Sequence, residues 1–495
     1  MEKPLLVFWQ CVIGPKLYQI YPNSLPRDQQ LTHLYRKNIS EIVSDSILLC
    51  LKASFGIFRM IWPLCFWYYY QTDSFTYENG ISFVENAICI SIIGIYFMLI
   101  RFSRYINPTY QSFAKELLNL KTNPTKEVRQ TFLSNFDFSI SHWKPDYVMN
   151  TSIAHEMPTV SSLNIETTYA ERILHYPILL LGYIGINMIG RRLLFPGSLQ
   201  IIRFIRHQYL LNGRMNLIVS YRAKRCLLRT PDGNTIDTVF IDRRPSELGQ
   251  TLVITCEGNA GFYEIGCMMT AIRNGYSVFG WNRPGFGESS GYPSVLSEIN
   301  AIDTILNYIT EQLHFPIDQI VLYAWSMGGY AACWAAVHYQ SIHGLILDAI
   351  FDDILPLAQR QMPSFTSKLV EKAIRYHFNL DNVHLLKSYN GPFILIRRTY
   401  DEVMNLTPNR FETNRVNTLL LHILPYRYPH IYKFNDESML LLREYLSANE
   451  EQRATLFNTY CSDNLQIEID NYRSEHSIVF YPCSFGLYCN SLRYY

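Results

Sequence analysis

The sequence predicts an α/β fold in its C-terminal half, a mostly parallel sheet with helices on both faces, preceded by N-terminal transmembrane or membrane-associated helices. From residue 221 onward, short β-branched apolar runs alternate with helical runs, as in parallel strands joined by helices. One of these runs ends in Ser326 and is followed by a helix of small residues. That pattern is typical of a nucleophilic serine at a strand-to-helix turn. Before residue 211 the chain is interrupted by long apolar segments, which predict the membrane part.

The composition excludes some classes of function. In the 495 residues, 43 Lys and Arg nearly balance 42 Asp and Glu, and no basic run suggests a nucleic-acid partner. Hydrophobic residues make up 48% and charged residues 17%, which favours contact with lipid as well as with a core. The 11 cysteines are spread singly without paired Cys/His spacing, so we expect no zinc site, no disulfide framework, and no metal or cofactor.

The N-terminal segment, residues 1–46, is predicted to lie in the cytosol. Its apolar patch Leu5–Gly14 is interrupted by Gln10 and lacks a cleavage site, so we interpret it as a retained segment and not as a secretory signal.

A transmembrane helical hairpin is predicted over residues 47–105. Ile81–Ile100 is twenty residues long and contains one charged residue, which is enough to span a bilayer. Ile47–Tyr70 is less apolar because Lys52 and Arg59 lie inside it, and such charges either snorkel or keep this half in the interface. The basic residues lie outside the pair, so both termini and the catalytic domain are expected to face the cytosol. Two buried helices of a soluble protein are the alternative.

Two further segments precede the sheet. Residues 106–168 are polar and mixed, which predicts a cytosolic linker with some helix. Residues 169–220 are apolar again but are punctuated by arginines such as Arg191 and Arg203. We expect a membrane-associated helical segment there, with its basic residues at lipid headgroups, or else a helix packed on the catalytic domain.

The catalytic domain is predicted over residues 221–495, with a partly apolar cap at about 351–390. A hairpin is expected over Cys226–Asp242, because Pro231–Asn234 is a turn sequence. The remaining elements, in chain order, are a strand at Leu252–Cys256, a helix at Phe262–Asn274, a strand at Tyr276–Trp281, a helix at Glu298–Leu313, the strand before Ser326, and strands at His343–Ala349 and Pro392–Arg397.

Ser326 is the candidate nucleophile. A tight turn needs small residues two positions before and two after the serine, and here they are Ala324 and Gly328. The usual form of this signature has glycine at both positions, so Ala324 departs from it. The alternative interpretation is a serine that caps an ordinary helix.

A serine nucleophile needs a base and an orienting acid, which follow it in the order acid and then histidine in this architecture. Asp401 follows the last predicted strand and is the preferred acid, with Glu402 beside it. Asp348, at the end of the preceding strand, is the alternative.

Three histidines follow the candidate acid: His422, in an apolar helical run, His430, in a loop, and His476. His476 is preferred because it follows Leu465–Ile469, whose alternation fits a last strand, although a helix fits it as well.

The oxyanion of an acyl-transfer reaction needs two backbone N–H groups. Met327 supplies one at the start of the helix, and the turn after the strand Leu252–Cys256 supplies the other, from Asn259 or Ala260. Arg283, Arg397 and Arg398 are candidates for binding the phosphate or carboxylate of a lipid, and structural ion pairs are the alternative.

Several motifs together resemble the α/β-hydrolase-domain-containing protein 16 family. They are Glu257–Glu264, Gly280–Gly285, Tyr323–Gly329, Leu347–Asp353 and Arg397–Glu402, and the likeness extends to Gly14–Tyr21 and Gly190–Ser198. The resemblance implies an α/β-hydrolase fold and matches Ala324. It carries the acid onto Asp401 and the histidine, in Tyr-x-x-Glu-His, onto His476. The likeness fades after His476.

The same resemblance implies an activity and a location. It implies a multi-pass protein of the endoplasmic-reticulum membrane that removes an acyl chain from phosphatidylserine, leaving lysophosphatidylserine, with monoacylglycerol hydrolysis as a further activity. The expected partners are therefore these lipids in a bilayer. A thioesterase or acyltransferase on the same triad, or a membrane-anchored adaptor without turnover, are the alternatives.

Overall fold

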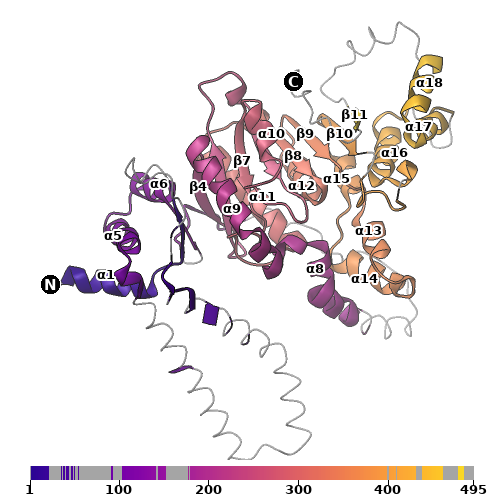
Figure 1. Cartoon of the computed structure of the whole chain (residues 1–495). Helices are drawn as coiled ribbons and strands as arrows, with labels where there is room; N and C mark the ends of the chain where they lie inside the picture. The colour runs from indigo at the N-terminus through magenta and orange to yellow at the C-terminus, as the bar shows by residue number, and fades with distance from the viewer. Residues whose placement is uncertain are drawn as a thin grey trace, which may run out of the picture. The chain divides into compact units, whose positions relative to one another are not determined.

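The computed structural model of the chain describes residues 2–21, 103–140, 143–151, 179–398, 401–408, 410–430, 437–460 and 478–483, with short stretches between residues 35 and 92 and at 177. These residues form two compact units, Met1–His142 and Trp143–Tyr495 (Figure 1).

The first unit is a small α/β unit. Its elements are α1 (Glu2–Ile13), β1 (Leu17–Ile20), α4 (Ser103–Ile106), α5 (Pro108–Thr122), α6 (Lys126–Asn135) and β2 (Phe136–Phe138), and β1 pairs antiparallel with β2. Phe113 lies at its centre, with ring centroids 5.5 Å from Phe132 and 5.2 Å from Phe136. The prediction of a linker from residue 106 is therefore corrected for this part, because its aromatic residues pack into a core.

A buried ion pair closes the first unit across the predicted hairpin. The Nε of Arg104 donates to Oε1 of Glu41 at 3.0 Å, and both side chains are fully buried. Because Glu41 precedes residues 47–100 and Arg104 follows them, the chain returns to the place it left.

The predicted spans themselves, residues 47–70 and 81–100, lie almost entirely outside the described residues. Within the part of the chain that the structure describes, no helix combines the length and the apolar character needed to cross a membrane.

The second unit is built on one sheet in the order β11-β10-β9-β8-β6-β7-β5-β4-β3. β5 runs antiparallel to both of its neighbours, and every other pair is parallel. The strands are β3 (Tyr147–Val148), β4 (Lys224–Arg229), β5 (Thr235–Ile241), β6 (Leu252–Cys256), β7 (Ser277–Trp281), β8 (Ile320–Trp325), β9 (Gly344–Asp348), β10 (Phe393–Arg398) and β11 (Ile478–Cys483). The predicted hairpin and parallel strands are confirmed.

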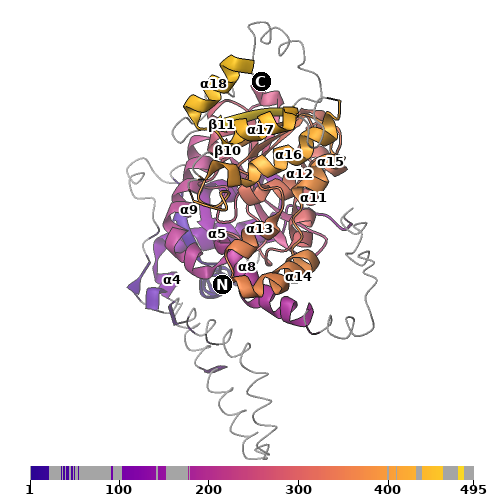
Figure 2. The same cartoon turned by 90° about the vertical axis from the view of Figure 1, so that its right-hand side faces the viewer.

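Helices surround this sheet, and α8, α13 and α14 lie together beside its serine end in both views (Figures 1 and 2). Residues 179–185 are helical and continue into a π-helical turn, Ile186–Gly190. The α-helices that follow are α8 (Arg191–Leu194), α9 (Gln200–Ser220), α10 (Met268–Arg273), α11 (Val295–Glu311), α12 (Gly329–His338), α13 (Ile354–Arg360), α14 (Ser367–His377), α15 (Asn382–Ser388), α16 (Arg415–Arg427), α17 (Glu437–Ser447) and α18 (Glu450–Tyr460).

Helix α10 is shorter than the predicted Phe262–Asn274. Residues 263–267 form turns, and the helix begins only after Cys267, whose N–H donates to Oε1 of Glu257 at 2.9 Å. Helix α11 begins earlier than predicted, because Ser294 and Ser297 form a reciprocal capping box.

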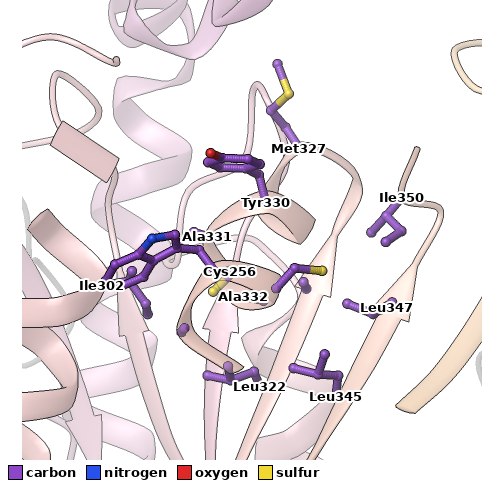
Figure 3. Close-up of a cluster of buried hydrophobic side chains, with 14 of the residues drawn as sticks. Cys256, Ile302, Leu322, Met327, Tyr330, Ala331, Ala332, Leu345, Leu347 and Ile350 are labelled. Carbon is purple, nitrogen blue, oxygen red and sulfur yellow. The ribbon is translucent and has the colours of Figure 1, made fainter. Parts of the chain in front are cut away.

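The core holds the serine strand in place. Small residues of α12, among them Ala331 and Ala332, lie over the strand residues Leu322 and Leu345 (Figure 3). Trp334, on the same helix, is fully buried. Because small side chains let the helix approach the sheet closely, the end of β8 has little freedom to move.

Candidate active site

The turn at Ser326 has the strained geometry of a nucleophile elbow. Ser326 follows β8 directly and has a φ of +53°, in the left-handed region that residues other than glycine rarely adopt. A single 3₁₀ turn, Ser326–Gly328, leads into α12. The serine side chain is only partly buried. A strained, accessible serine at the start of a helix favours the nucleophile over a helix cap, whose backbone is normally extended.

Gly328 and Ala324, two positions after and before Ser326, are small for different structural reasons. A Cβ on Gly328 would stand 2.0 Å from the carbonyl oxygen of Cys256, so only glycine lets the helix start approach the end of β6. Ala324 is fully buried in the sheet, between Cys256 of β6 and Leu347 of β9. The fold therefore accommodates one methyl group there, which explains the departure from glycine.

The predicted oxyanion turn lies beside the serine. Met327 and Asn259 line the same pocket as Ser326, and Ala260 is next to Asn259. The turn is closed by the N–H of Gly261, which donates to the carbonyl of Gly258 at 3.1 Å. The structure thus brings the serine and the candidate donors together at the carboxyl ends of β6 and β8, where open parallel sheets bind ligands.

Residues 197–206, which precede β4 in the chain, form hydrogen bonds with the Gly258–Gly261 turn. The N–H of Gly197 donates to the carbonyl of Asn259 at 3.2 Å, and Nη1 of Arg206 donates to the carbonyl of Ala260 at 2.9 Å. Both carbonyls therefore point toward residues 197–206. No sequence pattern predicted this contact.

Asp401 and Asp348 have different environments. Oδ1 of Asp401 accepts the N–H groups of Val403 and Met404, both at 2.9 Å, so the backbone orients its carboxylate. Asp348 instead forms a bidentate ion pair with Arg398, at 2.9 and 2.7 Å. An acid that is already paired with arginine is a poor partner for histidine, so the geometry favours Asp401. Glu402, beside it, is exposed.

The predicted base, His476, lies outside the described residues, as does Leu465–Ile469. The last described strand, β11, follows His476 in the chain, whereas the expected last strand precedes it. Its β-branched and aromatic residues were a signal that the sequence prediction did not use. His422, on α16, and His430, after it, are both exposed. No histidine is found among the described residues that line the pocket.

The three candidate arginines do not line the pocket. Arg283 is buried, and its guanidinium donates to Glu298 Oε1 at 3.2 Å and to the carbonyl of Glu257 at 2.7 Å. Arg397 is fully buried and donates to Asn417 and to a carbonyl of α17. Burial lowers the pKa of Arg397 to about 10. Arg398 is paired with Asp348. All three arginines therefore have structural contacts within the protein, which was the alternative interpretation of the sequence.

The pocket itself is apolar and has a volume of about 270 Å³. Its walls come from residues 181–194, from α13 and α14 of the predicted cap, and from the loop after Asp401. The polar side chains among the described lining residues are Asn259, Ser326, Arg360 and Gln361. A mostly apolar cavity that contains the candidate nucleophile fits a hydrocarbon chain ending in an ester.

Arg360 is a pocket residue that the sequence prediction missed. It stands at the end of α13, and its Nη1 donates to the carbonyls of Glu402, Val403 and Asn405 at 3.0, 3.3 and 2.7 Å. It therefore ties the cap to the loop that carries Asp401. An arginine that ends a helix and precedes Pro363 by three positions resembles an ordinary helix terminus, so nothing in the sequence marked it.

Glu257 is a buried carboxyl group directly before the oxyanion turn. Burial raises the pKa of Glu257 from 4.5 to about 7, although the N–H and thiol of Cys267 donate to its Oε1 and oppose the shift. The folded protein therefore retains this proton at pH values where the unfolded chain has lost it.

This shift predicts a pH dependence of stability. As pH rises from about 4.5 to about 7, the unfolded chain ionises Glu257 first, and the free energy of unfolding falls by roughly 3 kcal/mol. Glu257→Gln mimics the protonated form, so it removes this pH-dependent contribution to the free energy of unfolding. We expect the Tm of the wild type, relative to that of Glu257→Gln, to be lower at pH 8 than at pH 5. Equal Tm differences at the two pH values would contradict the assignment.

Comparisons with known proteins agree with this architecture. The sequence family described as "Phosphatidylserine Lipase ABHD16 N-terminal domain" matches residues 6–139, and the family described as "alpha/beta hydrolase fold" matches residues 251–414.

Individual relatives cover nearly the whole chain. The phosphatidylserine lipases ABHD16A of Homo sapiens and Bos taurus are each 33% identical, over 96% of this chain and 91% of theirs. An uncharacterized protein of Caenorhabditis elegans is 32% identical over 86% of this chain and 85% of its own. Among solved structures, the Pyrococcus furiosus esterase PF2001 has a TM-score of 0.34 and 17% identity, covering 42% of this chain and 79% of that chain.

Proposed function

This chain belongs to the ABHD16 family of phosphatidylserine lipases, and on that basis we propose that it is a membrane-anchored serine lipase. It is a hydrolase of the lipase and esterase type with an α/β-hydrolase fold. It removes one acyl chain from phosphatidylserine and releases lysophosphatidylserine and a fatty acid. Monoacylglycerol, which presents the same ester on a smaller headgroup, is a second substrate.

The observation that carries the proposal is the single pocket in which a strained serine meets an apolar channel. Ser326 and the candidate oxyanion residues Met327 and Asn259 line this pocket, and most of its other walls are apolar side chains of the cap and of residues 181–194. A serine that must attack an ester at the end of a hydrocarbon chain requires this combination. Arg360 is the cation among the described lining residues, and we propose it as a contact for the phosphate or carboxylate of the headgroup.

The proposed reaction proceeds in two steps. His476, oriented by Asp401, takes the proton of Ser326 while Oγ attacks the ester carbonyl, and the N–H groups of Met327 and of Asn259 or Ala260 stabilise the oxyanion. The ester C–O bond then breaks, and the alcohol of the lysolipid leaves with the proton from His476. Water, activated by the same histidine, hydrolyses the acyl-serine and releases the fatty acid. No metal or cofactor takes part.

Membrane anchoring is the second part of the proposal. The twenty-residue run Ile81–Ile100 has the length of a span, and the Glu41–Arg104 ion pair brings the flanks of residues 47–100 together. We place both flanks, and with them the catalytic domain, in the cytosol at the endoplasmic-reticulum membrane. Attachment of a fluorescent protein to either terminus, with protease protection of isolated membranes, tests this orientation.

The activity is tested with the purified full chain. Vesicles that contain phosphatidylserine, phosphatidylcholine or monoacylglycerol are supplied separately, and free fatty acid and lysolipid are measured. We expect fatty acid and lysophosphatidylserine in equal amounts from phosphatidylserine. Adding an alcohol acceptor distinguishes a hydrolase from an acyltransferase, because the latter forms a new ester. The absence of lysophosphatidylserine would overturn the proposed substrate.

Gly185 offers a test of the acyl channel. It lines the pocket, and a Cβ at this position would meet nothing within 4 Å, so a larger side chain fits at this wall of the pocket without a clash. We expect Gly185→Leu to lower kcat/KM for long-chain phosphatidylserine on the order of tenfold or more. Activity on a water-soluble butyrate ester should be unchanged, because a short chain does not reach this position.

Asn187→Leu is the matched control for Gly185→Leu. Asn187 lies on the same helical segment but does not line the pocket, so the same new side chain should leave the chain-length preference unchanged. Replacing a helical glycine also favours the helix, so lost stability would not explain a lower rate. An unaltered chain-length profile in Gly185→Leu would show that the acyl chain lies elsewhere.

A further inference from the structure

Residues 180–209, which we call the apolar segment, expose large apolar side chains in helical register. On α9, Ile201, Phe204, Ile205 and Tyr209 lie on one stripe and are 61–78% exposed, although the usual surface helix turns its apolar stripe toward the core. The preceding helix repeats the pattern with Leu180, Ile184 and Met188, which are 42–60% exposed. A soluble surface rarely exposes so much apolar area in one stretch unless it binds a partner.

The charges of the same region fit an anionic lipid surface. Residues 177–220 contain no Asp and no Glu, whereas Arg192 and Arg203 lie beside the exposed stripes. Arg191 and Arg206 are also in this region, but they contact the ring of Tyr292 and the carbonyl of Ala260. Arg192 is itself exposed, between the two helices. Apolar side chains flanked by arginines, without acidic residues, are typical of helices that lie in the plane of a membrane interface.

The active-site pocket reaches the surface along this segment. Leu181, Ile189 and Leu193 line the pocket and are also 57%, 55% and 54% exposed. A lipid that leaves the bilayer at this point passes from the acyl layer into the pocket with its chain in apolar surroundings throughout. The alternative route through water would expose the apolar chain, which is unfavourable.

We propose that the apolar segment is a docking surface for an anionic bilayer. Its helices lie in the interface, with Phe204 and Ile205 among the acyl chains and Arg192 and Arg203 at the headgroups, so that the mouth of the pocket opens into the acyl layer. The proposal rests on the proposed lipase function and deepens it, because it states how the substrate enters. Gly197 and Arg206 hold the oxyanion turn, so the docked segment is also attached directly to the catalytic centre.

The double variant Phe204→Ser/Ile205→Ser of the full chain tests the surface with two substrates. We expect the rate on phosphatidylserine in vesicles to fall about tenfold or more, because burial of these two side chains in lipid is lost. The rate on a water-soluble butyrate ester should not change. Leu248→Ser is the matched control, because Leu248 is 48% exposed beside the start of β6, at the opposite end of the sheet from Ser326.

A direct measurement separates docking from damage to the fold. Phe204→Trp keeps the apolar character, and its added fluorescence should be quenched by vesicles of brominated phosphatidylserine more strongly than that of the wild type. Absence of this extra quenching would overturn the proposal, because it would place Phe204 against protein or water. Equal loss of both activities in Phe204→Ser/Ile205→Ser would overturn the docking proposal too. Hydrolysis of phosphatidylserine in detergent micelles reports separately on the lipase function.

Discussion

Replacement of Ser326 with alanine is expected to abolish phosphatidylserine hydrolysis while the protein stays folded. In serine hydrolases the loss of the nucleophile lowers kcat by about 10⁴- to 10⁶-fold, because the oxyanion donors alone retain only a small part of the catalysis. Ser326 is partly exposed at the end of β8, and alanine fits the same space. Both residues resist the φ of +53° to a similar degree, so the Tm should change by a few degrees at most.

A fluorophosphonate probe provides the second readout of this prediction. The wild type should be labelled, and Ser326→Ala should not, whereas Ser341→Ala should be labelled like the wild type because Ser341 is an exposed surface residue. His476→Ala should lose activity and labelling together, and His430→Ala should retain both. Labelling that persists in Ser326→Ala would assign the nucleophile to another residue. Activity that persists in His476→Ala would assign the base to another histidine.

The serine end of the sheet could be predicted from sequence because local signals agree there. Each of β6, β8 and β9 is a short apolar run bounded by loop residues, and the helix after Ser326 must consist of small residues to pack on the sheet. The alternation of side chains between the two faces of a strand also explains why neighbouring residues have different contacts. Arg397 and Arg398 point to opposite faces of β10, so one is buried against α17 and the other pairs with Asp348.

Other features depend on contacts distant in sequence and could not be predicted. No local pattern connects the elements joined by the ion pair between Arg283 and Glu298. The same is true of the hydrogen bonds from Arg360 to the loop after Asp401. The phenylalanine cluster of the first unit is similar, because Phe113 meets Phe136 only after two helices have packed. The helix expected from Phe262 was overpredicted because the residues there are apolar in helical spacing, whereas in the structure they form turns and α10 begins only at Met268.

Neutralising each candidate acid by substitution with asparagine separates Asp401 from Asp348. Asn at 401 can still accept the N–H groups of Val403 and Met404 with its oxygen, so the loop keeps its shape and only the charge is lost. We expect Asp401→Asn to lower kcat by about 10⁴-fold, because the histidine loses the carboxylate that fixes its tautomer and stabilises its cation. The Tm should stay close to that of the wild type.

Asp348→Asn is expected to have the opposite pattern. Asp348 is nearly buried and bonds Arg398 through both of its oxygens, and Arg398 in turn lies over the ring of Trp325, next to the nucleophile. Asparagine cannot keep both charge-assisted bonds, so we expect a loss of about 1–2 kcal/mol of stability, reduced by the partial exposure of Arg398. The activity of the protein that remains folded should fall less than tenfold. If the two variants exchange these patterns, Asp348 is the catalytic acid, and the carboxylate bound by the Val403 and Met404 amides has only a structural role.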